Sequence, residues 1–417
     1  MRVLQNIKDV VKSNMCLGCG LCSVVSDTNG MIFSNRNDCY IPKSLGVEDY
    51  SLANRICPAR GYAVNTLSRE LFGLQGTKDD ELGLIDIAIA AHSTDQSILE
   101  NASSGGVITT LLLYLLEKKI VDKVSVTQLV CDYSGVHTKT NLTSDRKEIL
   151  KAQGSKYCPV DLSGLLKELT LFDGKVAIMA TPCAIAGIRN IQKCVPGFIK
   201  SQIVLCVANF CGGFKSFRNI ERLAEIHNVD YHALKDFRFR GGGQPGSLRF
   251  VTNDGKSVGT PYPKYVGLTG YSKMLRCHFC VDATGELADI ACGDAWIPRF
   301  EKDRNPWSMV ICRTESASKL IRKMCSDGVL VSEHVSKDEI KRSQKFNLIS
   351  KKSRQSARMK FYSLLGYRLP DLYSQGYSKQ NSSMQTEAIV YFKHKLTLWA
   401  EKLGLYMVLY GRKKLMK

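Results

Sequence analysis

The stretch Met15-Cys16-Leu17-Gly18-Cys19-Gly20-Leu21-Cys22, with Cys57-Pro58 further along the chain, decides the class of this protein. Three thiolates spaced by two residues can wrap one loop around an iron–sulfur cube, and a distant Cys-Pro closes the site. Gly18 and Gly20 let the backbone approach closely and turn its amides toward the sulfurs. Zinc is the alternative, although zinc sites usually take two pairs of ligands. We therefore predict electron transfer through a 4Fe–4S cluster on Cys16, Cys19, Cys22 and Cys57.

The composition fits a globular redox protein of more than one domain. The chain has 417 residues, of which 44% are hydrophobic and 23% charged, and this length exceeds one typical core. Its 16 cysteines indicate metal or redox ligands in a reducing cytosol, not disulfides. The residues after Met1 lack the apolar core of a signal peptide, and no apolar run is long enough for a membrane span. We expect a cytoplasmic protein.

The formal charge of +19 raises nucleic acid or an anionic membrane as partners. Basic residues are concentrated near 339–360 and 393–417, and no zinc-finger, RNA-recognition or basic-zipper pattern accompanies them. We therefore expect no nucleic-acid binding. A basic rim that attracts an anionic cofactor or a membrane surface explains the charge better.

A polar, glycine-rich stretch, Glu100 to Gly106, follows a predicted buried strand over 85–91 and precedes a predicted helix over 107–119. A loop of this kind at a helix N-terminus binds phosphate through free amides and the helix dipole. Ser103 or Ser104 could equally be an ordinary N-cap. Both interpretations stay open.

The sequence Gly154-Ser155-Lys156-Tyr157 precedes another amphipathic segment, 162–171. A lysine beside Gly-Ser at a helix entrance fits a phosphate or an electron-rich flavin edge. A solvated surface lysine explains the same pattern. The polar stretch 76–84, earlier in the chain, is read as a linker.

Two successive predicted strands end in cysteine. The strand 174–180 leads into Thr181-Pro182-Cys183 and a helix, and the strand 203–210 leads into Cys211. Such strand-to-helix turns bind ligands in α/β folds. With Cys277 and Cys280 these cysteines make four thiolates, enough for a second 4Fe–4S cluster. The cysteines that we expect to be buried or free thiols are Cys39, Cys194 and Cys206.

Two features around this second set are open to two interpretations each. The loop Gly241 to Gly246, within a predicted strand pair over 236–258, is a mobile loop over a site or a hairpin turn. Asp294 faces a cofactor or caps the following turn. Cys292 is a spare ligand, and His278 is expected to be exposed and not a ligand. His278 and Asp294 are proton-donor candidates by neighbourhood alone, so we assign no catalytic residue.

The ordered set of motifs resembles the coenzyme F420 hydrogenase/dehydrogenase beta-subunit family, whose members include the chloroplast hydroxymethyl-chlorophyll reductase. The resemblance covers roughly residues 85–335 and rests on separated signatures. They are Ser103-Ser104-Gly105-Gly106, Gly154-Ser155-Lys156-Tyr157, Thr181-Pro182-Cys183-x-x-x-Gly187-x-Arg189, Phe210-Cys211 and Cys277-x-x-Cys280 with Ala288-Asp289-Ile290 and Gly293-Asp294.

The resemblance implies an iron–sulfur flavoprotein with FAD and two 4Fe–4S clusters. By position, Cys183, Cys211, Cys277 and Cys280 would hold the cluster beside the flavin. The residues expected at FAD are Ser103, Ser104, Gly105, Gly106, Ser155, Lys156, Thr181 and Asp294. A flavin exchanges two electrons and a cubane one, so the combination couples the two kinds of transfer.

The implied fold class is α/β or α+β, in four parts. Residues 1–78 form a ferredoxin-like 4Fe–4S module, and 85–200 form the FAD-binding N-terminal part of the family domain. Residues 201–345 form its α+β C-terminal part with the second ligand set, and 371–417 form a Ser/Gln/Asn-rich linker and a basic helical tail. The tail fits a helix on a membrane surface, on a partner, or on its own domain.

The leading interpretation is an oxidoreductase that transfers electrons between ferredoxin-type clusters and a small-molecule substrate at FAD, with F420 or ferredoxin as electron partner. The alternative is an electron-transfer subunit that docks on a partner reductase or hydrogenase. A zinc-stabilised nucleic-acid-binding protein would leave the Ser-Ser-Gly-Gly and Thr-Pro-Cys turns unexplained. Family members also occur beside bacterial polysaccharide-synthesis enzymes, and a tail at the inner face of the membrane suits that setting.

Two departures from the family limit what is carried over. The sequence after Asp294 reads Ala-Trp-Ile-Pro, which follows the family's aromatic pattern only in part. The basic tail is not part of the shared core. Because members act on chemically different substrates, the deazaflavin itself is not implied.

Overall fold

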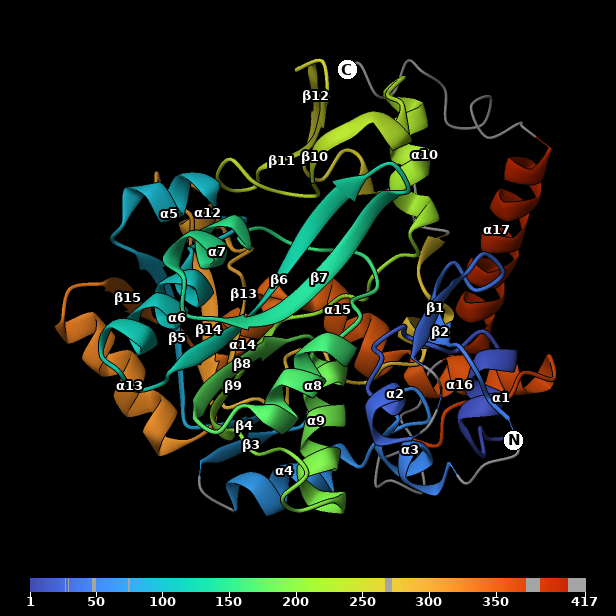
Figure 1. Cartoon of the computed structure of the whole chain (residues 1–417), viewed down its shortest axis with the longest axis horizontal. Helices are drawn as coiled ribbons and strands as arrows, with labels where there is room; N and C mark the ends of the chain where they lie inside the picture. The colour runs from blue at the N-terminus through green and yellow to red at the C-terminus, as the bar shows by residue number, and fades with distance from the viewer. Residues whose placement is uncertain are drawn as a thin grey trace.

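A mixed eight-stranded sheet forms the centre of the computed structural model, which describes residues 1–26, 28, 30–46, 50–73, 76–266, 272–372 and 383–403. The strand order is β15-β5-β14-β13-β9-β8-β6-β7 (Figure 1). The four neighbours β13, β9, β8 and β6 are parallel, and antiparallel strands extend the sheet on both sides. The bounds are β5 (Ile87–Ser93), β6 (Lys123–Asp132), β7 (Gly135–Thr143), β8 (Lys175–Ala180), β9 (Gln202–Asn209), β13 (Ile290–Asp294), β14 (Ser308–Cys312) and β15 (Leu330–His334).

Helices cover both faces of this sheet, because alternate residues of a strand point to opposite faces. On β8, Val176 and Ile178 pack in one cluster with α8 (Ser163–Leu171) and α9 (Pro182–Cys194). Ala177, between them, packs in the other cluster with α6 (Val107–Glu117) and α13 (Glu315–Ser326). The predicted strands over 85–91, 174–180 and 203–210 and the helices that follow the first two are confirmed within a few residues.

A separate three-stranded antiparallel sheet lies beside the main one at the top of Figure 1. Its strands are β10 (Leu234–Arg238), β11 (Ser247–Thr252) and β12 (Ser257–Pro261), and α10 (Arg218–Ile226) packs on it. The predicted strand pair is therefore confirmed, with a third strand added. The loop 241–246 joins β10 to β11. The remaining short elements are α5 (Gln96–Asn101), α7 (Arg146–Lys151), η1 (Tyr231–Ala233), α11 (Leu275–His278) and α12 (Pro298–Glu301).

The stretch 76–84 is a hairpin, not the expected linker. It pairs β3 (Thr77–Asp79) with β4 (Gly83–Ile85). Leu82 and Leu84 are buried, and the buried Arg313 donates to the carbonyl oxygens of both. The polar composition of the segment suggested a linker. The contact with Arg313, which is distant in the chain, leaves no signal in the local sequence.

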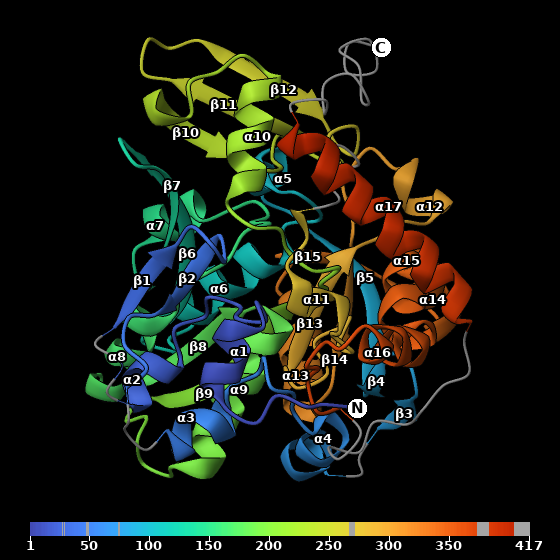
Figure 2. The same cartoon turned by 90° about the vertical axis from the view of Figure 1, so that its right-hand side faces the viewer.

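The C-terminal part is helical. Its elements are α14 (Lys337–Ser343), α15 (Lys345–Leu348), the π-helical turn η3 (Ile349–Ser353), α16 (Gln355–Leu364) and α17 (Met384–Lys402). In Figure 2, α17 runs diagonally across the outside of the molecule, and α16, which it contacts, lies below its lower end. The helical tail is thus confirmed for α17, while the linker residues 373–382 and the basic end 404–417 lie outside the described residues.

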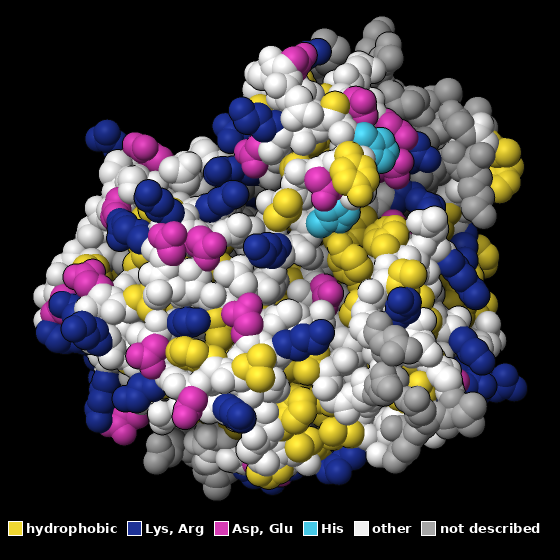
Figure 3. All heavy atoms as spheres, viewed as in Figure 1, with side chains coloured by type: hydrophobic (Ala, Val, Ile, Leu, Met, Phe, Trp, Pro, Cys, Tyr) yellow, Lys and Arg dark blue, Asp and Glu magenta, His cyan; other side chains and the backbone are white. Residues whose placement is uncertain are grey.

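The surface carries its charge in a dispersed form. Figure 3 shows Lys and Arg side chains spread over the visible face, with Asp and Glu between them. Among the described residues, no helix combines the length and the apolar character that crossing a membrane would require.

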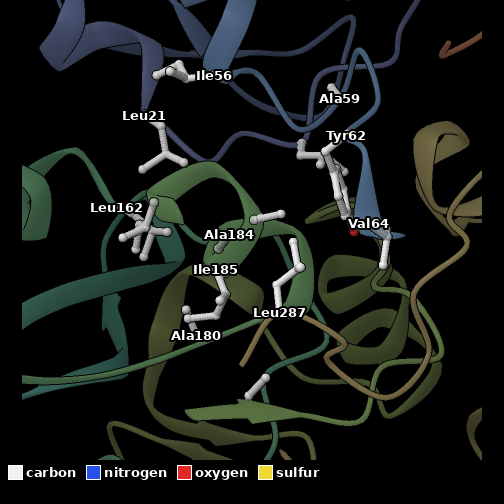
Figure 4. Packing of buried hydrophobic residues seen from close by; sticks show 14 of the residues in the cluster. Leu21, Ile56, Ala59, Tyr62, Val64, Leu162, Ala180, Ala184, Ile185 and Leu287 are labelled. Atoms are coloured by element: carbon white, nitrogen blue, oxygen red, sulfur yellow. The ribbon is translucent and has the colours of Figure 1, made fainter. Parts of the chain in front are cut away.

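The N-terminal part packs against the end of the sheet where β8 and β9 end. It contains α1 (Ile7–Lys12), α2 (Cys22–Val25), the hairpin β1 (Met31–Ser34) with β2 (Cys39–Pro42), α3 (Ser51–Ile56) and α4 (Val64–Phe72). Leu21 and Ile56 lie over Ala184 and Ile185 of α9 (Figure 4). A Cβ on Gly187 would stand 2.3 Å from Leu21 Cδ1, so a glycine there permits the close approach.

Candidate redox site

One cavity lies where the parallel strands end. Its volume is about 310 Å³, which is within the usual size of a small-molecule site. Ala180 ends β8, Asn209 ends β9 and Asp294 ends β13, and all three line it. Ligands of open α/β sheets bind outside these carboxyl ends. All residues expected at FAD except Gly105 line the cavity: Ser103, Ser104, Gly106, Ser155, Lys156, Thr181 and Asp294.

The loop 103–106 is fixed by contacts to the start of β14. Ser104 Oγ is 2.9 Å from the Trp307 carbonyl oxygen and 2.8 Å from Ser308 Oγ, and the Gly105 amide donates to Ser308 Oγ at 3.0 Å. Neither serine caps α6, because the N-cap is Gly106 with φ +70° and no side chain of the described residues caps this helix. The first amides of α6 are therefore left for another acceptor.

Gly105 is the tightest point of this loop, and replacing it tests the geometry. A Cβ there would stand 2.5 Å from the Ala91 carbonyl oxygen and 2.8 Å from the Ser308 nitrogen, both backbone atoms that cannot swing away. We expect Gly105→Ala to lower the free energy of unfolding by about 1–3 kcal/mol. Thermal unfolding measures this effect.

Gly164→Ala is the matched control, because a Cβ on Gly164 in α8 meets the Thr140 carbonyl oxygen at an ordinary 3.6 Å. Alanine is also the better helix former, so this variant should be as stable as the parent or more so. Equal behaviour of the two variants would show that the 103–106 loop is not under this constraint.

Arg240 connects the walls of the cavity, and the sequence analysis missed it. Its guanidinium donates to Asp294 Oδ2 at 2.8 Å, to the Tyr157 hydroxyl at 3.4 Å and to the Ser103 carbonyl oxygen. It also lies over the Tyr262 ring, 4.4 Å from the centroid. The side chain is 1% exposed. In the sequence, Arg238 and Arg240 alternate with two phenylalanines, a pattern that indicates strand residues facing solvent. The strand β10 ends at Arg238, however, so the alternation of the strand does not determine the direction of Arg240.

Asp294 is the partner of Arg240. Its carboxylate makes the ion pair, and its backbone oxygen accepts from Ser343 Oγ at 2.8 Å. The following helix, α12, is capped by Ile297. The interpretation of Asp294 as a cap is therefore wrong, and its carboxylate belongs to the cavity wall.

Lys156 is half-buried, so the solvated-lysine interpretation is also wrong. Its Nζ donates to the carbonyl oxygens of Ala152, Gln153 and Gly154, the last at 2.9 Å. Burial lowers its pKa to about 8. The Ser155 amide donates to Ser103 Oγ at 3.1 Å, which joins this turn to the 103–106 loop. One cation thus stands in the wall between the two loops.

The first thiol set consists of Cys16, Cys19, Cys22 and Cys57. Burial raises the pKa of Cys57 to about 11, with Cys16 contributing by charge repulsion. Burial likewise raises the pKa of Cys19, and Cys57, Cys22 and Cys16 add to the shift. The amides of Leu17 and Gly18 bond the Cys16 sulfur, and Gly18 and Gly20 have φ +70° and +71°. The structure therefore brings the four cysteines together with amides aimed at sulfur.

The second thiol set consists of Cys183, Cys211, Cys277 and Cys280. Burial raises the pKa of Cys183, and the other three thiols raise it further. The Gly213 amide donates to Cys211 Sγ at 3.3 Å. Lys351 Nζ of the π-helical turn donates to Cys280 Sγ at 3.3 Å and to the Asp282 carbonyl oxygen at 2.6 Å. The second set thus has a buried cation in direct contact.

The other cysteines stand apart from this set. Cys292 is buried in the core between sheet and helices, where Cys312 is its neighbour, and it also lines the cavity. Cys39 is a free thiol at the start of the short strand β2 and Cys206 is buried, both as expected. Cys194 is half-buried, so the expectation that it is buried is wrong. Among the residues that the structure describes, no three His, Cys, Asp or Glu side chains converge on one point as the ligands of a single metal ion do; the two thiol sets are groups of neighbouring cysteines without that convergence.

His278 is half-buried, so the expectation of an exposed imidazole is wrong. Burial, with the positive charges of Lys273 and Arg358, holds its pKa well below the usual value. Its ring lies 6.1 Å from that of His394 on α17. It is not part of the cavity wall, so the site gives it no access to a substrate there.

Hydrogen bonds to backbone carbonyl oxygens join the segments that contain the two thiol sets. Arg276, beside Cys277, donates to the Ala59 carbonyl oxygen at 2.7 Å and to the Pro58 carbonyl oxygen at 3.0 Å, next to Cys57. The Leu162 amide donates to the Cys19 carbonyl oxygen at 3.0 Å. The cavity is lined by Cys19 of the first set and by Cys183 and Cys211 of the second.

Comparison with known proteins places the chain in a family. Two family models describe the N-terminal and the C-terminal part of the coenzyme F420 hydrogenase/dehydrogenase beta subunit. Residues 88–167 match the first model, and residues 173–338 match the second. The chain belongs to the coenzyme F420 hydrogenase/dehydrogenase beta-subunit family, as the sequence motifs predicted.

The chain is similar to the coenzyme F420 hydrogenase subunit beta of Methanococcus voltae, at 29% identity over 263 residues, 61% of this chain and 85% of the relative. It is also similar to the coenzyme F420-dependent sulfite reductase of Methanocaldococcus jannaschii, at 23% identity over 82% of this chain and 50% of the relative. In fold it is similar to a chain of the F420-reducing [NiFe] hydrogenase complex from Methanosarcina barkeri, with a TM-score of 0.56 and 23% identity, over 71% of this chain and 99% of that one. The relatives are oxidoreductases or subunits of oxidoreductases by name.

Proposed function

We propose that this chain is an iron–sulfur flavoprotein oxidoreductase that transfers electrons between two 4Fe–4S clusters and a substrate at FAD. The observation that carries the proposal is the cavity bordered by both thiol sets, with Cys19 on one side and Cys183 and Cys211 on the other. A flavin bound there would exchange two electrons with a substrate and one at a time with each cluster.

The residues of the chain divide the work of such a site. The free amides of α6 and the turn around Lys156 suit the phosphates of FAD. Arg240 holds Asp294, Tyr157 and the 103–106 loop in register. Each set of four thiols, with amides or a lysine on its sulfurs, suits a cube in which every cysteine binds a different iron. In this proposal the chain positions the flavin and the clusters, and its amides and charged groups tune their redox potentials.

The second candidate is an electron-transfer subunit of a larger assembly. Several relatives are subunits by name, among them the hydrogenase subunit beta and the F420-dependent formate dehydrogenase subunit beta. In that case F420 or a ferredoxin would be the electron partner, and a partner subunit would act on the final substrate. The cavity beside both thiol sets favours chemistry on this chain.

Metal and flavin analysis of protein purified without oxygen tests the proposal. About eight irons and eight sulfides with one FAD per chain are expected for two clusters. About four irons with FAD would restrict the proposal to one set. Zinc in place of iron, without flavin, would overturn it.

The contact of Lys351 with Cys280 leads to a prediction on redox potential. A buried cation stabilises a reduced cluster, which carries one more negative charge. Burial alone would lower the pKa of Lys351, but the thiols of Cys280, Cys211 and Cys277 outweigh it and keep the ammonium charged. We expect Lys351→Met to lower the midpoint potential of one cluster by on the order of 100 mV, about the value of one charged hydrogen bond.

A redox titration monitored by electron paramagnetic resonance measures this shift without turnover. Lys360→Met, an exposed lysine on α16, is the matched control and should leave both potentials unchanged. A shift of both clusters by the same amount, or of neither, would contradict the assignment of Lys351 to the second set.

A further inference from the structure

The outer face of α17 is an exposed apolar stripe. It consists of Ile389, Phe392, Leu396, Trp399 and, just past the helix, Leu403, spaced alternately by three and four residues. Their exposed fractions are 69%, 63%, 60%, 57% and 54%. Residues at these spacings lie on one side of a helix. Large exposed side chains gathered in this way indicate an interaction surface.

The opposite face fixes the helix, so the stripe cannot turn inward. Glu387 is 2% exposed and accepts from Arg354 Nε at 2.6 Å and from Arg358 Nε at 2.8 Å. One turn further on, Tyr391 packs edge-to-face on Phe361. Separating α17 from α16 would leave a buried carboxylate and two arginines without partners, which is costly.

Positive charge borders the stripe on both sides. Lys393 and Lys395 are exposed, and Lys395 Nζ lies 5.4 Å from the Tyr391 ring centroid. The sequence between Glu387 and Glu401 contains no acidic residue. Residues 404–417, outside the described part, add Arg412, Lys413, Lys414 and Lys417 and no acidic residue. In Figure 3 hydrophobic and basic side chains lie together at the right-hand edge, where Figure 1 places α17.

We propose that α17 docks this protein on an anionic lipid surface, lying in the plane of the interface. An apolar stripe with aromatic residues between flanking lysines is the pattern of an interfacial helix. The lysine stems reach past the apolar face toward lipid head groups. A second copy of the stripe would bring lysines opposite lysines, which disfavours self-association. The stripe therefore fits an anionic lipid surface better than it fits the same stripe of a second copy.

Binding of the purified holoprotein to vesicles tests this proposal. We expect the protein to sediment with vesicles of phosphatidylcholine and phosphatidylglycerol in equal parts and to remain in solution with phosphatidylcholine alone. Raising the salt concentration should weaken binding, because exposed charges are screened. Trp307 is buried and Trp296 half-buried, so a blue shift of the emission should disappear in Trp399→Phe.

The double variant Phe392→Ser with Trp399→Ser should bind the anionic vesicles at least about tenfold more weakly. Its thermal unfolding should not change, because both side chains are exposed. Tyr133→Ser, at an 88% exposed aromatic residue in the β6–β7 turn, is the matched control and should bind like the parent.

Three outcomes would overturn the proposal. Binding that the double variant retains would exclude the stripe. No vesicle binding, with a dimer that the double variant dissociates, would assign the stripe to a second copy. No vesicle binding by a monomer would leave the stripe to a protein partner.

Discussion

Replacing Cys183 with serine is expected to remove one of the two proposed clusters and to leave the other. The iron content should fall from about eight to about four per chain, because a cube without one of its four thiolates is not retained. Burial and the thiols of Cys211, Cys277 and Cys280 raise the pKa of Cys183, so its sulfur stands among theirs. Cys19→Ser should remove the other half of the iron. Iron and sulfide analysis with electron paramagnetic resonance separates the two variants.

Cys292→Ser is the matched control for both. Cys292 is buried and, like Cys19 and Cys183, lines the cavity, but its thiol neighbour is Cys312 and it belongs to neither set. It should keep the full iron content. If it lost iron as Cys183→Ser does, the second set would be wrongly assigned. If Cys183→Ser kept all its iron, the second cluster would not exist.

The two thiol sets could be found from the sequence because their signals are local or topological. Cys16, Cys19 and Cys22 share one loop, where spacing alone fixes proximity. Cys183 and Cys211 each follow a buried apolar strand, and the carboxyl ends of neighbouring parallel strands meet at one edge. The apolar sequences of β8 and β9 therefore predicted two strands of the sheet and, with them, the edge at which Cys183 and Cys211 lie.

Other features depended on partners that are distant in the chain. Lys156 reads as a surface residue until its neighbour Ser155 bonds Ser103, 52 positions earlier. His278 is half-buried among residues distant in the chain, which include Arg358 of α16 and His394 of α17. In the hairpin 77–85, the buried carbonyl oxygens of Leu82 and Leu84 accept from Arg313, which lies far along the chain. In each case a contact with a residue distant in the chain determines whether a polar group is buried. The hydrophobic periodicity of the sequence does not report such contacts.

Arg240→Met is expected to cause the largest combined loss of stability and flavin. The variant removes the partner of Asp294, which is 19% exposed, and leaves the Ser103 carbonyl oxygen without its donor. Breaking a buried ion pair from one side typically costs about 3–5 kcal/mol. The 103–106 loop and Asp294 would then lose their common anchor, so bound flavin should fall as well. Thermal unfolding and the absorbance of released flavin measure the two losses.

Arg238→Met is the matched control two residues earlier, because Arg238, at the end of β10, pairs with Asp236 at 3.5 Å at the surface. Its effect on the free energy of unfolding should stay within about 0.5 kcal/mol. Flavin content should not change. If both arginine variants lost the same free energy of unfolding and the same amount of flavin, the buried contacts of Arg240 would not matter more than the surface ion pair of Arg238.

A double variant separates the structural role of the Arg240–Asp294 pair from its role at the cofactor. Replacing both charges, as Arg240→Met with Asp294→Leu, leaves no unpaired charge and is often nearly neutral for stability. Stability should therefore recover relative to Arg240→Met. Flavin binding should not recover, because the cavity wall has still lost the carboxylate of Asp294 and the Arg240 guanidinium that holds Tyr157 and Ser103 behind it. If both properties returned together, the pair would be a structural element only, and the flavin would have to be held by the α6 amides and Lys156.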